Sequence, residues 1–419
     1  MSTVNMVCNM DSNLIVSYTR LANGLKVYVI PNTGCGEVKI DIVVKYGGID
    51  KLYKDRISGK VKSIKEGIAH YIEHLMFYEE NRTEKEIFEI FDNLNAEVNA
   101  FTSMSWTKYS VVAYDDYVNP LRKLMKTVFV PYFSKETLEK ERKVVSSEIE
   151  ITKETNSILN LVYSKGKDLS VIGTKENLRD VTVEELYNIY ENYYTPNNMA
   201  IVVSGDVETV EVIEEVEAML EKLDIEKKPR VNKRKVKRQL LTKHLLVEEI
   251  NQNEVPVLQL ATKLNKIDID DIPKLKVALS IFQSMNLNCI SEFSLSLLDN
   301  AEIEGYFDCS YLQDKNMICY FVETYNPFEI KDKLVSYLKN FSVDNMTSDD
   351  FEIVKRAIYK DIIQEYILSI HDIVVDSFVD NSNIFEFIDV LNEITFDEYK
   401  RLVKKIINFD DNIYVYCKK

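Results

Sequence analysis

Apolar residues gather into two short runs near the start of the chain. The segments 25–30 (LKVYVI) and 38–44 (VKIDIVV) are rich in β-branched residues and alternate in places with polar ones. Glycine, proline and asparagine residues flank both runs, as expected of turns. The pattern predicts two antiparallel strands.

Two later segments have apolar residues at helical spacing. Between Thr83 and Leu94 the apolar positions recur three or four residues apart, and Thr83 with Glu86 fits a capping box. A longer helix is expected from about Lys135 to Glu154, where potential capping residues precede a periodic apolar face. Both helices belong to the first half of the chain.

An internal repeat relates the two halves. The segment VTVEELYNIYENYYTPNNMAIVV from Val181 is similar to ITFDEYKRLVKKIINFDDNIYVY from Ile394: each reads as a capped amphipathic helix, a turn and an apolar strand. The offset between these two segments also places KETLEKERKVV near Lys135 opposite SDDFEIVKRAI near Ser348. Two pairs of segments that share one offset predict a duplicated α+β domain.

Length and composition agree with two globular domains. A chain of 419 residues exceeds what one hydrophobic core usually organises, and 46% of its residues are hydrophobic and 29% charged. The polar, basic stretch KKPRVNKRKVKR predicts an exposed linker at 227–243, between a first domain at 1–226 and a second at 244–419. The alternative for this stretch is a nucleic-acid or localisation patch.

The net charge and the lack of targeting signals limit which partners and which cellular compartment are expected. A formal net charge of -16 argues against a nucleic-acid partner, because phosphate binding depends on clustered Lys and Arg. No apolar run is long enough to span a membrane, and the segment from Met1 to Asn13 lacks the pattern of a secretory signal. Six scattered cysteines suit a reducing compartment, so a cytoplasmic protein is expected.

The segment GIAHYIEHLMF, residues 67–77, carries the candidate chemistry. It places His70, Glu73 and His74 in the order H-x-x-E-H. Residues four apart lie on the same face of a helix, so both imidazoles can bind one metal ion with Glu73 beside them. Two imidazoles and a carboxylate from elsewhere, with one position left open, are typical of catalytic zinc. The sequence therefore predicts one Zn²⁺ per chain, with Glu73 as the general base.

The helix expected after Lys135 offers the third ligand. Glu141 and Glu148 are seven residues apart and face the same way, whereas Glu150 points elsewhere. Glu148 is the predicted ligand, and Glu141 is the predicted hydrogen-bond partner of a metal-binding histidine.

Chance occurrence is the alternative for this motif, since two histidines on a helix can be ordinary surface residues. The chain has only four histidines, however, and two of them fall in the motif. The other two, His244 and His371, have no such companions and are expected to be structural or surface residues.

At these residues the sequence resembles the inverted-motif zinc peptidases: pitrilysin, insulysin and the β subunit of mitochondrial processing peptidase. The segment ERKVVSSE, residues 141–148, resembles the family's helix with the glutamate ligand. The segment from Asn99 to Thr102 resembles the strand edge that receives the substrate backbone, which implies substrate binding at Asn99 and Ala100. The resemblance implies an α+β fold with two homologous αβ domains of the processing-peptidase type, each an antiparallel-rich sheet covered by helices.

One departure from the family concerns its second domain. Many members carry an Arg followed by a Tyr that contact the substrate, but the comparable stretch here, from Ser291, has no arginine. Beyond Arg238 the only arginines are Arg356 and Arg401, both in predicted helices elsewhere. This pattern is similar to the zinc-bearing subunits of bacterial two-subunit peptidases, whose zinc-less partner supplies the missing groups. A homodimer in which Tyr306 substitutes for the pair is the alternative.

The function expected from this pattern is a zinc metallo-endopeptidase that cleaves unfolded peptides or peptide precursors and works as a dimer. Two alternatives stay open. The first is a zinc-less subunit that forms a peptide-binding chamber without hydrolysis. The second is a zinc hydrolase that acts on a non-peptide amide.

Overall fold

The structure is a computed structural model of the chain. It describes residues 4–7, 15–32, 34–151, 170–225, 245–248, 255–264, 272–287, 291–305, 307–312, 317–343, 346–406 and 413–418. The predicted linker at 227–243 lies outside these residues, as do His244 and Tyr306.

The contacts divide the chain into two compact units. The first contains residues 1–155, 169–237 and 369–382, and the second contains residues 156–168, 238–368 and 383–419. Residues 369–382 therefore cluster with the first unit, although they come late in the sequence.

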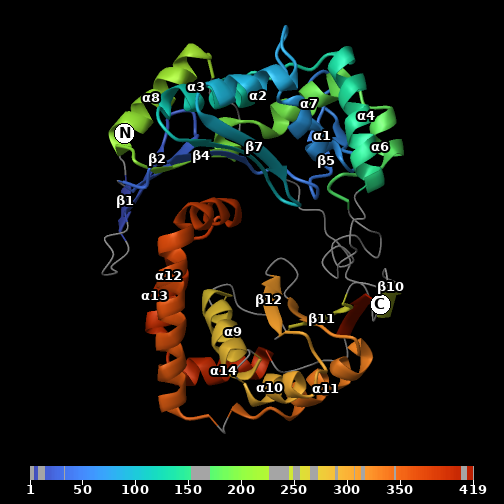
Figure 1. Cartoon of the computed structure of the whole chain (residues 1–419), viewed down its shortest axis with the longest axis vertical. Helices are drawn as coiled ribbons and strands as arrows, with labels where there is room; N and C mark the ends of the chain where they lie inside the picture. Colours follow the sequence, from blue (N-terminus) through green and yellow to red (C-terminus); the bar gives the residue numbers. More distant parts are fainter. Residues whose placement is uncertain are drawn as a thin grey trace. The chain divides into compact units, whose positions relative to one another are not determined.

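The first unit is built on a seven-stranded sheet (Figure 1). The strand order is β1 (Val4–Val7), β2 (Ile15–Arg20), β3 (Lys26–Pro31), β9 (Met199–Gly205), β4 (Val38–Val44), β8 (Thr107–Ala113) and β7 (Ala96–Thr102). A separate hairpin joins β5 (Leu52–Lys54) and β6 (Val61–Ser63). All neighbours pair antiparallel except β3 and β9. The strand β7 is an edge strand of the described sheet.

The two strands predicted near the N-terminus are β3 and β4, but they are not partners. β9 lies between them, parallel to β3 and antiparallel to β4. The predicted antiparallel sense is correct, and the two strands are joined through β9 and not directly. β9 is buried along almost its whole length, as expected of a strand with a neighbour on each side.

Helices cover one face of this sheet, as Figure 1 shows. They are α1 (Ile68–Leu75), α2 (Glu84–Asn93), α3 (Val118–Phe129), α4 (Lys135–Ile151), α6 (Lys175–Arg179), α7 (Val183–Tyr193) and α8 (Thr209–Lys222), with a 3-10 turn at Pro196–Asn198. The predicted capping box of α2 is present: Thr83 N–H donates to Glu86 Oε2 at 2.7 Å.

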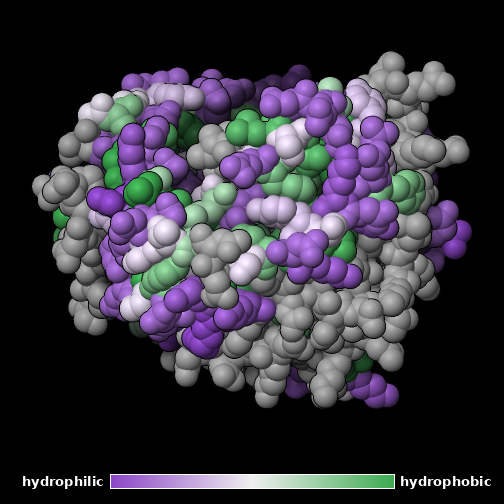
Figure 2. Space-filling model, turned by 90° about the horizontal axis from the view of Figure 1, so that it is seen from below, coloured by the Kyte–Doolittle hydropathy of each residue, from purple (hydrophilic) through white to green (hydrophobic). Residues whose placement is uncertain are grey.

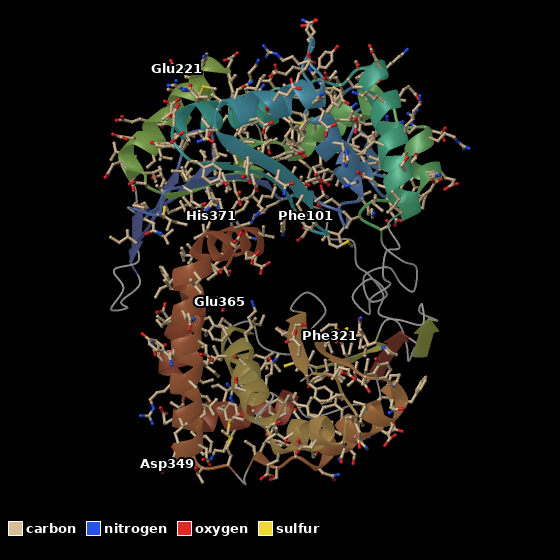
Figure 3. The ribbon with its side chains drawn as sticks, viewed as in Figure 1. Phe101, Glu221, Phe321, Asp349, Glu365 and His371 are labelled. Carbon is tan, nitrogen blue, oxygen red and sulfur yellow. The ribbon has the colours of Figure 1, made fainter. Side chains whose placement is uncertain are left out.

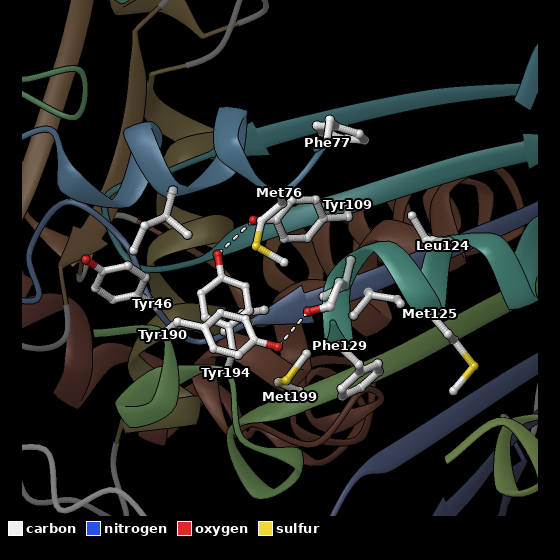
Figure 4. Packing of buried hydrophobic residues seen from close by; sticks show 14 of the residues in the cluster. Tyr46, Met76, Phe77, Tyr109, Leu124, Met125, Phe129, Tyr190, Tyr194 and Met199 are labelled. Atoms are coloured by element: carbon white, nitrogen blue, oxygen red, sulfur yellow. Dashed lines mark hydrogen bonds between the residues drawn. The ribbon is translucent and has the colours of Figure 1, made fainter. Parts of the chain in front are cut away.

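The core between helices and sheet combines aliphatic side chains with buried tyrosines (Figure 4). The hydroxyl groups of Tyr109 and Tyr194 form a hydrogen bond of 2.7 Å, and the Tyr190 hydroxyl donates to the Val128 carbonyl at 2.9 Å. Burial raises the pKa of each of these tyrosines. The hydroxyl groups thus stay protonated and are paired within the core.

The second unit has a five-stranded sheet of the same topology. Its order is β10 (Leu245–Glu248), β14 (Ile413–Lys418), β11 (Val257–Lys263), β13 (Met317–Glu323) and β12 (Asp308–Leu312). β10 and β14 are parallel, and the other pairs are antiparallel, as in the series β3, β9, β4, β8 and β7. Its helices are α9 (Ile272–Asn286), α10 (Glu292–Asp299), α11 (Pro327–Asn340), α12 (Ser348–Asp380), α13 (Glu386–Glu393) and α14 (Phe396–Ile406).

The predicted duplication is confirmed by these elements. α4 and α12 begin at Lys135 and Ser348, and α7 and α14 begin at Val183 and Phe396. Both pairs of helices are therefore separated by the offset that the sequence repeat predicts. The α+β class with two homologous domains is correct.

The helix α12 is kinked at Ser369, where the backbone leaves the helical region (φ −130°, ψ 20°). The residues after the kink belong to the first unit, and His371 is 5% exposed there (Figure 3). Its Nδ1 lies 2.6 Å from Ser204 Oγ and its Nε2 lies 3.1 Å from Asp41 Oδ2. Lys108 Nζ lies 3.0 Å from the same carboxylate. Burial would raise the pKa of Asp41, but His371 and Lys108 lower it to about 2.

The surface is mixed in character. On the face drawn in Figure 2, hydrophilic side chains are interspersed with small hydrophobic groups. Among the described residues, no helix has the length and apolar character needed to cross a membrane.

The buried charge of Asp41 is expected to stabilise the first unit. Asp41→Asn keeps the size of the side chain but removes the charge that Lys108 and His371 face, so we expect a loss of about 3 kcal/mol of unfolding free energy. Asp372→Asn is the matched control, because Asp372 meets the same lysine with 55% of its side chain exposed. It should cost under about 1 kcal/mol. Urea unfolding followed by the fluorescence of Trp106, the single tryptophan, measures both, and equal losses would contradict the expectation.

Candidate metal centre

The helix α1 carries the H-x-x-E-H motif. It begins after Gly67, whose φ of 85° favours glycine, and a Cβ there would lie 2.4 Å from the Ile172 carbonyl oxygen. Ile68, Ile72 and Leu75 are fully buried in the core. Because these residues occupy the inner face of the helix, the histidines lie on another face.

The helix α4 packs against α1. Ser134 Oγ accepts a hydrogen bond from Thr137 N–H at 3.1 Å at its start, and Leu138 and Val145 are buried. The Tyr71 hydroxyl of α1 donates to the Leu138 carbonyl of α4. This contact fixes the register that brings the α4 glutamates to the histidines.

Three potential metal ligands meet between these helices. Among the described residues, His70, His74 and Glu148 form the one group whose ligand atoms all lie within 4.8 Å of one another. Glu148 Oε2 lies 3.4 Å from His74 Nε2 and 3.9 Å from His70 Nε2. Ligands about 2.1 Å from a tetrahedral zinc ion lie roughly 3.4 Å apart. The two distances from Glu148 are close to this spacing, so the three residues fit a zinc ion.

Electrostatics keeps His70 available as a ligand. Burial and the nearby charge of His74 lower the pKa of His70 to about 4, so its imidazole is neutral near pH 7 and can donate a lone pair to a metal. Burial also acts to lower the pKa of His74, but the hydrogen bond to Glu141 and the charge of Glu148 outweigh it and raise that pKa. The negative charges of Glu141 and Glu148 thus favour the binding of a cation between α1 and α4.

Glu73 is held by the end of the edge strand β7. It is 8% exposed, and Thr102, the last residue of β7, donates its hydroxyl to Glu73 Oε2 at 2.6 Å. Burial raises the pKa of Glu73, although the Thr102 bond and His74 oppose the rise. A carboxylate with a raised pKa beside a metal site is suited to accept a proton.

Glu141 lies behind His74. Its Oε2 lies 3.2 Å from His74 Nδ1, and its Oε1 accepts a hydrogen bond from the Tyr78 hydroxyl at 2.6 Å. Burial would raise the pKa of Glu141, but these two hydrogen bonds lower it overall. Glu141 thus lies within hydrogen-bonding distance of His74, a candidate ligand.

Glu150, on the same helix, points away from the histidines and pairs with Lys175. The structure thus places Glu148, and not Glu150, beside His74.

Two residues of this site were not assigned from the sequence. Thr102 was part of the segment compared with the family, but no local pattern links a residue on a strand to a glutamate 29 positions earlier. Tyr78 lies four positions after His74, which is a helical spacing, yet α1 ends at Leu75. The turn after the helix, and not the helix itself, brings Tyr78 to Glu141.

The predicted substrate-binding residues lie on β7. Asn99 is exposed, and its Oδ1 accepts a hydrogen bond from Ala100 N–H at 2.8 Å. β7 pairs only with β8 among the described strands. Phe101, labelled in Figure 3, is a residue of the same strand and is 57% exposed.

The remaining expectations concern His371 and two arginines. His371 is buried in the Asp41 cluster, so it is structural, as one of the two alternatives held. Arg356 and Arg401 lie on α12 and α14, as predicted.

Two family models match this chain. "Insulinase (Peptidase family M16)" matches residues 62–171, which include α1 and α4, and "Peptidase M16 inactive domain" matches residues 180–358. The two matches are consecutive; the second begins within the first unit, before α7, and continues into the second unit.

Related sequences and solved structures agree with these family models. The uncharacterised zinc protease YmfH of Bacillus subtilis is 28% identical over 229 residues, covering 53% of each chain. The probable mitochondrial-processing peptidase subunit beta of Arabidopsis thaliana is 25% identical over 49% of this chain and 38% of its own length. The putative M16-like peptidase of Alicyclobacillus acidocaldarius has a TM-score of 0.81 at 20% identity, covering 98% of this chain and 99% of that one. The match spans about half the length of YmfH and less of the subunit beta.

This chain belongs to the M16 peptidase family, and its two-domain fold is that of M16 peptidases.

Proposed function

We propose that this chain is a zinc metallo-endopeptidase that hydrolyses peptide bonds in unfolded peptides or peptide precursors. The observation that carries the proposal is the meeting of His70, His74 and Glu148 within 4.8 Å, with Glu73 beside them on the same helix. The intact set of ligands and base argues against a zinc-less chamber-forming subunit.

The residues divide the work as follows. His70, His74 and Glu148 would hold the zinc ion, which when bound lowers the pKa of a water molecule to roughly 7 and polarises a carbonyl. Glu73 accepts the proton of the attacking water and passes it to the leaving amine. Thr102 holds the Glu73 carboxylate in one orientation through its 2.6 Å hydrogen bond. Glu141 keeps His74 in place.

The edge strand supports a peptide as the substrate over another amide. β7 ends at Thr102, whose hydroxyl contacts Glu73, so a peptide added along β7 as a further strand would pass the general base. Main-chain hydrogen bonds would supply most of the affinity, which suits extended, unfolded substrates. Asn99 and Ala100 are the proposed contacts on this edge.

A homologous partner subunit is part of the proposal. Beyond Arg238 the arginines lie on α12 and α14, and the stretch from Ser291 that is similar to the family's substrate-contacting segment has none. A relative is named as one subunit of a processing peptidase. The catalytic chain of a heterodimer is therefore favoured, and a homodimer is the alternative.

The first test is metal content. The purified protein should hold about one zinc ion per chain, and His70→Ala or His74→Ala should remove it, because two remaining ligands hold catalytic zinc weakly. Elemental analysis measures the ratio. Glu150→Ala is the matched control on α4, since Glu150 pairs with Lys175, and it should keep its zinc. Full zinc content in both histidine variants would rule out this site.

The second test separates the base from the ligands. Glu73→Gln should keep zinc, because Glu73 is not a ligand, while peptide hydrolysis falls by about 10²-fold or more. Cleavage of an unstructured fluorogenic peptide, measured on samples of equal zinc content, gives the ratio. Activity near that of the wild type would exclude Glu73 as the base.

The third test concerns the partner. If donors for the substrate come from a second chain, this protein alone should bind zinc but cleave peptides poorly. Adding a homologous subunit that carries Arg and Tyr in its second domain should raise kcat/KM by about 10²-fold, since oriented donors contribute several kcal/mol to such barriers. Peptide hydrolysis with and without the partner, together with the mass in solution, measures this. Full activity as a homodimer would contradict the heterodimer.

A further inference from the structure

Tyr78 is a buried residue whose hydroxyl contacts Glu141, beside the candidate metal site. It follows the end of α1 and is 3% exposed. Its hydroxyl donates to Glu141 Oε1 at 2.6 Å, and Lys140 Nζ lies 5.3 Å from the centre of its ring. No step of the proposed hydrolysis needs Tyr78, so its contact calls for a separate explanation.

The contact completes the hydrogen bonding of a fully buried carboxylate. Glu141 is 0% exposed, and each of its oxygens has one partner: Tyr78 on Oε1 and His74 Nδ1 on Oε2. A buried carboxylate held at one oxygen can rotate, and its other oxygen is left without water or a donor. Two partners on opposite oxygens fix its plane.

We infer that Tyr78 is a positioning residue for the metal centre: it fixes Glu141 so that His74 presents Nε2 to the metal. A series of hydrogen bonds runs from the Tyr78 hydroxyl through the Glu141 carboxylate to His74 Nδ1–H. On the other side of the imidazole ring, His74 Nε2 lies 3.4 Å from Glu148 Oε2. Outer hydrogen bonds of this kind set the tautomer and the ring orientation of metal-binding histidines.

The direction of the first hydrogen bond is fixed by chemistry. An ionised carboxylate only accepts, so the tyrosine must donate. Burial and the neighbouring Glu141 raise the pKa of Tyr78, so its proton stays in place. The carboxylate is thus kept ionised and oriented, and it accepts from His74 on its other oxygen.

The two histidines differ in this support. His70 Nδ1 is buried without a hydrogen-bond partner among the described residues. Of the two imidazoles, the described residues therefore orient that of His74 through its hydrogen bond to Glu141. This increases the effect on zinc affinity that we expect from the loss of the Tyr78 hydroxyl.

The inference rests on the proposed zinc site, and its test measures zinc affinity apart from peptidase activity. Tyr78→Phe removes one oxygen atom and should raise the zinc Kd about tenfold in chelator competition. Tyr190→Phe is the matched control: it also removes a buried hydroxyl, the one that donates to the Val128 carbonyl, without touching Glu141. Its Kd should stay within about twofold of the wild type, because it leaves the His74 hydrogen bond intact.

A double-mutant cycle tests the route through Glu141. In a Glu141→Ala background, Tyr78→Phe should change the Kd by less than about twofold, because the side chain that accepts its hydrogen bond is gone. Trp106 fluorescence during urea unfolding checks that every variant is folded. An unchanged Kd in Tyr78→Phe, an equal change in Tyr190→Phe, or a full effect in the Glu141→Ala background would overturn the inference.

Failure of the inference about Tyr78 can be distinguished from failure of the proposed function. A wild-type protein that binds zinc but cleaves no peptide would overturn the proposed peptidase, while the affinity series still decides the role of Tyr78. A wild-type protein that binds no zinc would overturn both.

Discussion

The candidate centre depends on how α4 packs against α1. The motif places two imidazoles and a carboxylate on one helix, but the third ligand and the support of His74 come from the other. The Tyr71 hydroxyl bond to the Leu138 carbonyl fixes the start of that contact, and Glu141 and Glu148 follow one and three turns later on the same side. A shift of α4 by one residue would turn both glutamates away, so the packing of two helices decides whether any metal can bind.

The sheet sets the second constraint. Its edge strand β7 ends at Thr102, and the hydroxyl of that residue holds Glu73. Thr107 lies opposite in the sheet register, and its hydroxyl donates to the Tyr46 carbonyl at 2.9 Å. The proposed base is therefore anchored to the sheet, whereas the candidate ligands are anchored to the helix pair. Because β7 is an edge among the described strands, the strand that orients the proposed base has one side open to a further strand.

Periodicity explains what the sequence could predict. The spacing of four between His70 and His74 and of seven between Glu141 and Glu148 gives helical faces directly, and the constant offset between the repeated segments gives the duplication. Contacts between distant segments leave no local period, so the sequence pattern could not predict them. The insertion of β9 between β3 and β4, the burial of His371 against Asp41 and the reach of Tyr78 all join distant segments. Such pairings depend on total burial in the folded unit, which no window of sequence records.

The duplication separates the fold from its chemistry. The second unit repeats the sheet order and the strand directions of the first, yet the only cluster of three potential ligands among the described residues lies in the first. The sheet and its buried core are thus formed twice, and among the described residues only the first copy contains the candidate metal-ligand cluster. The apolar burial of β4 and β9, with their long-range pairing, stabilises the fold, and the α1 and α4 side chains add the site to it.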